Sequence, residues 1–260
     1  MTIEGTIPMS PPEVAVSRRR LAAPAALLAA VLLGTLPAGC SMVVEKRAGW
    51  TPILPPPGGT STAATAANGL DRLDAGDVYG RIHQAFDESP SVHATGELAA
   101  QDDTVLLDVH LEAGGAQGTF VSSSLGRVTQ IVVGQAVYLS GDQAFLRSLG
   151  GEALAARGRD GAWISGTRRS PGLVALPLLS KAEYLALLSS SRLYSLGDDF
   201  TAGVRTRTFT NDDGLRMEVP LAGEPRLMRA WKHDRDGHLD LHFEYGPRWA
   251  VQAPGTAGVV

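Results

Sequence analysis

Two stretches of strict alternation constrain the fold of this 260-residue chain more than any other feature. In residues 105–112 the odd positions are apolar and the even positions are polar, except Leu106. In residues 239–245 the odd positions are again apolar, and the even positions carry carboxylates or imidazole. Side chains of a strand alternate between two faces, so each stretch predicts a strand with one buried face and one solvated face.

Several other segments have the composition of strands. They are short, rich in Val, Ile, Thr and Tyr, and separated by glycines, and they cover residues 92–98, 118–122, 128–133 and 136–140. Residues 217–221 alternate as well, and Asp234–Gly237 is typical of a hairpin turn between two strands. Four or five consecutive strands joined by tight turns predict an antiparallel meander.

Helical spacing appears before and between the two runs of strands. Apolar residues recur every three to five positions over residues 73–86, and helical patterns return at 143–149, 152–157 and 181–189. The order is one helix, a run of strands, two or three helices, and a second run of strands. This order predicts an α+β domain in which helices lie on one face of a curved antiparallel sheet.

The N-terminal region has the pattern of an export signal. Arg18–Arg20 form a basic cluster, residues 21–36 are apolar and uncharged, and small residues lead into Cys40, the only cysteine. The segment resembles the bacterial lipoprotein signal peptide, which implies cleavage before Cys40 and lipidation of its thiol. An ordinary exported protein and a cytosolic protein with a buried thiol are the alternatives, and the export route, Sec or twin-arginine, stays open.

Composition divides the chain into four parts. Residues 1–39 are predicted as the signal peptide, and residues 40–70, rich in Pro, Gly, Ala and Thr, as a disordered tether. Residues 71–250 have the composition of a globular domain, and residues 251–260 are predicted as a flexible tail.

Short motifs in the globular part resemble a known family. They are SVHATGEL after the first helix, GRVTQIVVGQAVYLSG, the Gly161–Ile164 step, and GEPRLMRAWKHDRDGHLDLHFEYG near the end. In this order they resemble the actinobacterial LppX and LprG-type lipoproteins, which are similar to LolA-type carriers. The resemblance implies a half-open β-barrel wrapped over helices, with acyl chains held in a hydrophobic cavity between the two layers.

The inward positions of the predicted strands are the candidate wall of that cavity. Each of them also has the ordinary alternative of a packed core, which periodicity does not distinguish from a hollow. The candidates are mostly aliphatic, which suits acyl chains, and they are Val105, Leu107, Val109, Leu111, Val137, Leu139, Met217, Val219, Leu239, Leu241 and Phe243.

Motifs of enzymes and of nucleic-acid-binding proteins are missing from the sequence. It has no Gly-x-Ser-x-Gly elbow and no phosphate-binding Gly-x-x-x-x-Gly-Lys loop, and its formal net charge is −4. His233, His238, His242 and their neighbouring carboxylates contain the ligand types of a zinc site, but a solvated outer strand face is the explanation that the alternation favours. We therefore expect no catalytic residue, no cofactor, no metal and no nucleic-acid partner.

The sequence thus predicts a lipid-anchored lipoprotein at the outer face of the cytoplasmic membrane. By resemblance, its function is to bind or carry lipid or lipoglycan acyl chains, including palmitate-like chains, as a monomer, with a membrane transporter as a candidate partner. The alternative is a structural or regulatory lipoprotein of the same fold, with a closed core, that binds a protein partner.

Overall fold

The computed structural model describes residues 66–100, 103–170, 173, 176–189, 192–235, 237–247, 249–255 and 259–260. The predicted signal peptide, Cys40 and most of the predicted tether lie outside these residues. Within them, no helix has the length and apolar character needed to cross a membrane.

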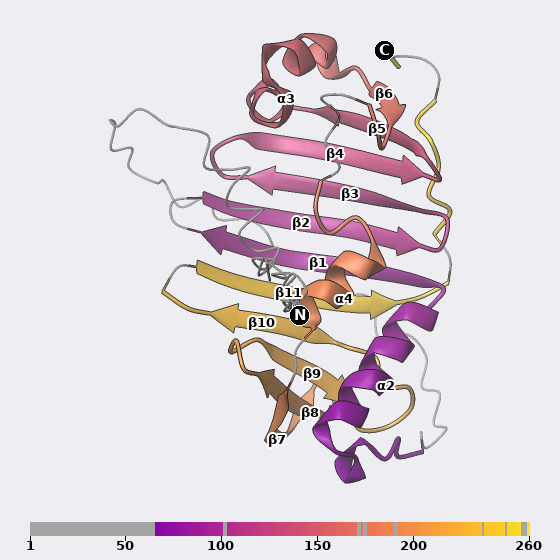
Figure 1. Ribbon diagram of the computed structural model, residues 1–260, viewed down its shortest axis with the longest axis vertical. Coiled ribbons are helices and arrows are strands. Elements are labelled where there is room, and N and C mark those ends of the chain that lie inside the picture. The colour runs from indigo at the N-terminus through magenta and orange to yellow at the C-terminus, as the bar shows by residue number, and fades with distance from the viewer. Residues whose placement is uncertain are drawn as a thin grey trace, which may run out of the picture.

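The described chain is built around one antiparallel sheet of eleven strands (Figure 1). The strand order is β6-β5-β4-β3-β2-β1-β11-β10-β9-β8-β7, so β6 and β7 are the two edge strands. The strands are β1 (Ser91–Ala100), β2 (Asp103–Glu112), β3 (Gly115–Ser122), β4 (Gly126–Val133), β5 (Ala136–Gly141), β6 (Ile164–Thr167), β7 (Leu193–Thr201), β8 (Val204–Asn211), β9 (Arg216–Pro220), β10 (Arg229–His233) and β11 (Gly237–Tyr245).

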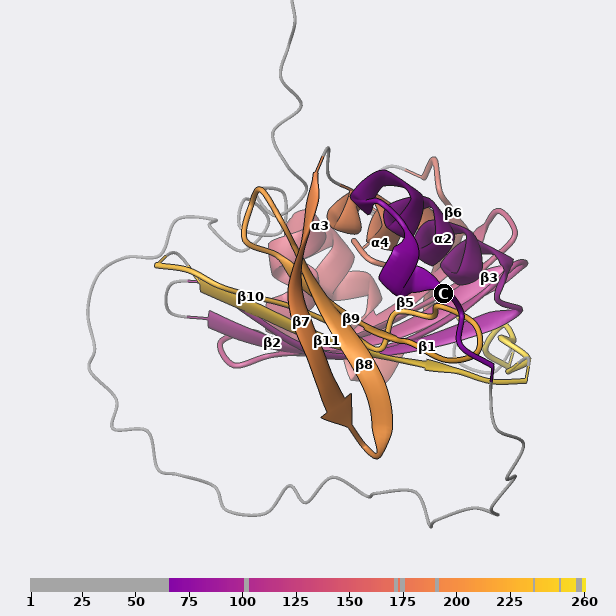
Figure 2. The ribbon, with the colours of Figure 1, turned by 90° about the horizontal axis from the view of Figure 1, so that it is seen from below.

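The helices lie on one face of this sheet, and the β7–β8 hairpin runs steeply across the direction of the other strands (Figure 2). The helices are η1 (Leu70–Arg72), α2 (Ala75–Glu88), α3 (Gln143–Arg157), η2 (Arg159–Gly161) and α4 (Lys181–Leu188). The predicted α+β fold, an open antiparallel sheet with helices on one face, is therefore confirmed.

Local sequence explains where the helices begin and bend. The Asp74 carboxylate accepts the Asp77 N–H at 3.0 Å and caps α2, and the Ser180 hydroxyl accepts the Glu183 N–H at 3.3 Å at the start of α4. Helix α3 joins the two predicted helices at 143–149 and 152–157 across a kink, because Gly150 and Gly151 have non-helical backbone angles.

Four strands, β6, β7, β8 and β10, were not named from the sequence, and of these only β10 is implied, by the predicted hairpin turn that follows it. β6 has four residues, and β7 and β8 lack the alternation of a half-buried strand. In β7 every residue from Tyr194 to Phe200 is exposed, so no apolar period marks it. Its pairing with β8 supplies the backbone hydrogen bonds that a pattern of side chains does not reveal.

The folded part extends beyond the predicted boundaries of 71 and 250 at both ends. Ala67, predicted in the tether, forms an antiparallel bridge with Ala222, and Val259, predicted in the tail, forms a parallel bridge with Trp163. The Val260 N–H also donates to the Trp163 carbonyl at 2.7 Å. Backbone pairing holds these residues in place. The sequence near Ala67 and Val259 has no periodic pattern of apolar residues that would predict this pairing.

Candidate functional site

The face of the sheet that the helices cover carries all eleven residues predicted to line a cavity. Ten of them are buried, and Leu239 is partly buried against the others. All belong to one hydrophobic cluster with residues of α2, α3 and α4. The predicted inward face is thus the observed one, whereas the role of these residues in ligand binding stays a prediction.

An aromatic cluster joins the helical layer to the sheet in the middle of this face. Phe86 of α2, Tyr184 of α4 and Phe243 of β11 contact one another with ring centroids 5.6 to 6.2 Å apart. Tyr245 meets Phe86 edge-on at 6.3 Å. Tilted and edge-to-face rings at such distances attract one another beyond their buried area.

The Tyr184 hydroxyl is the exceptional polar group of this aromatic cluster. The residue is fully buried, and its hydroxyl has no hydrogen-bond partner among the described residues. Burial raises the pKa of Tyr184 well above its usual range, so the group stays a neutral phenol with a proton to donate. By contrast, the Tyr245 hydroxyl donates to the Leu227 carbonyl at 2.9 Å.

An apolar segment between α3 and α4 completes the cover of the inner face. Its described residues are Leu173 and residues 176–179, and all its leucines are buried. The Leu176 N–H donates to the buried Gln130 Oε1 of β4 at 2.7 Å. Leu179 lies over Gly118 of β3, where a Cβ would come within 2.6 Å of the Leu179 Cδ2. Sequence reasoning missed this segment, although four leucines within residues 173–179, interrupted by Pro177, are a signal for buried irregular chain.

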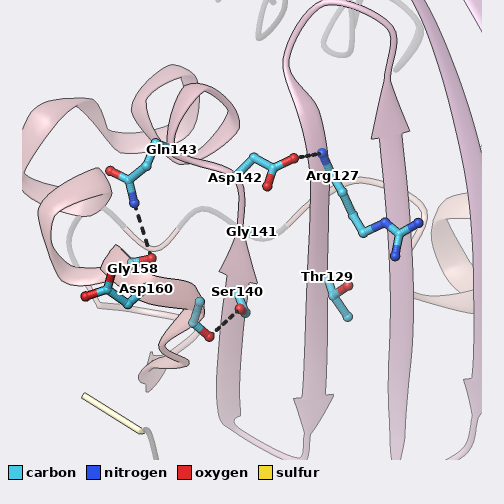
Figure 3. Close-up of a pocket in the computed structure, with 9 residues that line it drawn as sticks. Arg127, Thr129, Ser140, Gly141, Asp142, Gln143, Gly158 and Asp160 are labelled. Atoms are coloured by element: carbon cyan, nitrogen blue, oxygen red, sulfur yellow. Dashed lines mark hydrogen bonds between the residues drawn. The ribbon is translucent and has the colours of Figure 1, made fainter.

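A polar pocket of about 310 Å³ lies at another place, between β4, β5 and α3 (Figure 3). The Asp142 carboxylate accepts the Arg127 N–H at 2.8 Å, and the Gln143 side chain donates to the Gly158 carbonyl at 3.2 Å. The Arg127 guanidinium points away from Asp142 (Figure 3). None of the predicted cavity residues lines this pocket, and its hydrogen bonds hold α3 against the sheet.

In the part of the chain that the structure describes, the polar residues predicted around β11 do not converge on one point. His238 contacts Glu97 of β1 at 2.7 Å, and its ring stacks on His233 at 5.5 Å. Asp240 instead accepts two hydrogen bonds from Arg229, at 2.6 and 2.8 Å. Burial alone would raise the pKa of Asp240, but the bonds and charge of Arg229 outweigh it and hold that pKa below its usual range.

Comparison with known proteins gives matches only among solved structures. No family model matches the sequence, and no curated protein matches it either. LppX, a lipoprotein of Mycobacterium tuberculosis, is 16% identical with a TM-score of 0.42, over 68% of this chain and 99% of that one. LprF from Mycobacterium bovis is 14% identical with a TM-score of 0.42, over 68% of this chain and 95% of that one.

A protein known to form a complex is also similar in structure. MucB is 16% identical with a TM-score of 0.38, over 72% of this chain and 65% of that one, and it has also been solved in complex with MucA(peri). The structures similar to this chain thus include LppX and LprF, proteins of the type that the sequence motifs resemble.

Proposed function

We propose that this protein is an extracytoplasmic lipoprotein, anchored through Cys40, that binds or carries acyl chains of a lipid or lipoglycan between its sheet and its helices. The proposal assigns it no enzymatic activity. The acyl chains would lie against the aliphatic inner face, beneath α2, α4 and the apolar segment.

The hydroxyl of Tyr184, which has no hydrogen-bond partner in the described part of the chain, is the observation that carries this proposal. A buried hydrogen-bond donor without a partner costs about 1–3 kcal/mol, so native proteins seldom keep one without a reason. An ester or amide carbonyl of an acylated lipid is a suitable acceptor, because it brings an oxygen into an otherwise apolar environment. The neighbouring rings and aliphatic side chains would contact the chain itself.

The test uses two tyrosines of the same aromatic cluster. Tyr184→Phe removes a hydroxyl that bonds no described residue, so we expect the free energy of unfolding to stay the same or rise slightly. The affinity for a fluorescent acyl lipid should fall about five- to tenfold, which is the value of one hydrogen bond. Tyr245→Phe removes a bonded hydroxyl, so we expect a loss of about 1 kcal/mol in the free energy of unfolding and unchanged lipid affinity.

Native mass spectrometry of the purified protein, before and after organic extraction, completes this test. A co-purifying acyl species that is lost on extraction supports the proposal. Protein that is empty in every preparation and takes up no fluorescent lipid would refute it, whatever the two variants do.

Anchoring is tested separately, because Cys40 lies outside the described residues. Acylation requires the thiol, so Cys40→Ala should abolish incorporation of a fatty-acid analogue and release the protein from the membrane fraction. Two buried acyl chains, at about 0.8 kcal/mol per methylene, suffice for stable anchoring. Label in the variant, or none in the unchanged protein, would contradict the lipoprotein assignment.

Partner binding is the second candidate function, and the β7 edge favours it. Leu196 is 52% exposed and Phe200 71% exposed on a strand with one open edge. An open edge can pair with an extended segment of another protein. If the core is closed and this edge is the binding surface, native mass spectra should show protein without lipid. Phe200→Asp should then abolish binding of the partner protein.

A further inference from the structure

Four polar residues come together on the face of the sheet opposite to the helices. His93 on β1 pairs with His110 on β2 in the strand register, and with Glu244 on β11 on its other side. Asp108 lies two residues before His110 and therefore on the same face. Three adjacent strands thus place two imidazoles and two carboxylates side by side.

The distances within this group are those of a set of metal ligands. His93 Nε2 lies 2.8 Å from Asp108 Oδ1, and His110 Nε2 lies 3.6 Å from the same oxygen. One ligand atom of each residue lies within 4.8 Å of the others. Around a tetrahedral zinc ion with bonds of about 2.0–2.1 Å, ligand atoms are about 3.3 Å apart. The two measured distances bracket this value.

We propose that His93, Asp108 and His110 form a binding site for a divalent transition-metal ion, for which Zn²⁺ is the probe. Two imidazole nitrogens and one carboxylate oxygen match the preferences of zinc and leave a fourth position for water. The Asp108 side chain is 59% exposed, so this fourth position opens to solvent. The site is independent of lipid binding, because it lies on the other face of the sheet.

The surroundings of the two imidazoles support this assignment. Glu244 Oε2 lies 3.6 Å from His93 Nδ1, so a small movement would let this second carboxylate accept a hydrogen bond and orient a metal-binding His93. The rings stack at 4.1 Å with an interplanar angle of 9°. Trp249 meets both rings edge-on, at 5.3 Å from His93 and 4.5 Å from His110. These contacts keep the two imidazoles together, and binding of one ion by both would turn one ring out of the stack, because a metal ion lies in the plane of each ring that it binds.

A second pair of stacked histidines on the same face provides a matched control. His233 and His238 also pair across two strands and stack at 5.5 Å, and His238 also contacts a carboxylate, that of Glu97. Among the described residues, only His93, Asp108 and His110 bring three ligand atoms within reach of one ion. The second pair therefore tests whether paired histidines alone suffice.

The experiment titrates Zn²⁺ alone into the purified full chain by calorimetry and measures melting temperature with and without the ion. We expect one ion per chain and a higher melting temperature in the unchanged protein. His110→Gln should weaken binding by at least about tenfold and abolish the rise in melting temperature, and Glu244→Gln should weaken it about tenfold. His233→Gln should leave both unchanged.

Co²⁺ gives a readout that does not depend on stability. In the proposed site its visible absorption should have the intensity of four-coordinate cobalt, and the ion should quench Trp249 fluorescence, an effect lost in Trp249→Phe. Less than one ion bound per chain, or equal weakening by His110→Gln and His233→Gln, would overturn the proposal.

Discussion

At the scale of single residues, some buried polar groups have several hydrogen-bond partners and others have none among the described residues. Asp103, at the start of β2, has several such partners. Its carboxylate accepts the Ser123 hydroxyl at 2.7 Å, the Ser122 hydroxyl at 2.8 Å and the Ser124 N–H at 3.1 Å. The carboxylate thus ties β2 to the β3–β4 turn, whereas the Tyr184 hydroxyl has no such role.

The Asp103 network predicts a pH dependence of stability. Burial alone would raise the pKa of Asp103, but the bonds from the Ser123 and Ser122 hydroxyls and from the Ser124 N–H outweigh it and hold that pKa below its usual range. A lowered carboxyl pKa adds stability above the unfolded pKa of about 3.9, and this is lost as the pH falls through the folded pKa.

Urea unfolding of the unchanged protein and of Asp103→Asn measures this contribution. We expect the variant to be less stable at pH 6, with the difference shrinking as the pH falls below about 4. A difference that is the same at both pH values would show that the charge of Asp103 contributes nothing.

At the scale of elements, close backbone contact fixes the centre of the sheet. Gly96 of β1 lies between β2 and β11, and a Cβ at this position would come within 2.0 Å of the Asp240 carbonyl oxygen and 2.9 Å of the Leu241 Cα. Both are backbone atoms, which no side-chain rotation can move. Glycine is therefore required for the pairing of β1 with β11, which are the first and last strands along the chain and neighbours in the sheet.

Two glycine substitutions, expected to change the free energy of unfolding in opposite directions, test this requirement. Gly96→Ala should lower the free energy of unfolding by about 3 kcal/mol or more, at the upper end for single substitutions. Gly80→Ala, within α2 and with open space around its Cβ, should raise it by about 0.5–1 kcal/mol. Thermal melting of both variants measures the effects, and a Gly96→Ala protein as stable as the original would contradict the packing.

At the scale of the whole molecule, the arrangement is an open sheet whose covered face is apolar and whose other face carries the polar groups. A layer of short helices and the apolar segment closes the covered face. Binding of acyl chains there requires the two layers to accept extra volume. A tightly packed core would not do so, because overpacking costs about 1–3 kcal/mol.

Tryptophan substitution on both faces of the sheet measures this capacity. If acyl chains bind, Val109→Trp or Leu241→Trp should block lipid uptake while the melting temperature of at least one variant stays close to that of the unchanged protein. Leu106→Trp is the control, because Leu106 is on the same strand as Val109 but 48% exposed on the opposite face. Asp240 is unsuitable as an outward control, because it binds Arg229.

One outcome of the tryptophan substitutions would contradict the binding of acyl chains. If both inward variants melt at much lower temperature and the unchanged protein takes up no lipid, the inner face is a closed core. The second candidate function, partner binding through the β7 edge, would then be preferred.

Periodicity made much of the fold predictable. Strands β1 to β5, β9 and β11 and helices α2, α3 and α4 follow from local patterns, because burial on one face selects apolar residues at periods of 2 or 3.6. The inward positions of β2 and β11 follow from the same rule. Strands β7 and β8 do not, because the side chains of β7 are exposed from Tyr194 to Phe200 and the buried positions of β8 do not alternate.

The sequence by itself determined the faces of the strands, the order of the elements and the resemblance to LppX and LprG-type lipoproteins. Only the tertiary structure decided which distant residues meet. Of the residues that the structure describes, none bonds the Tyr184 hydroxyl between α4 and β11, and His93, Asp108 and His110 come together rather than the histidines clustered along residues 233–242. The physical reason is that strand register, which sets these contacts, depends on long-range pairing and packing that local periodicity does not encode.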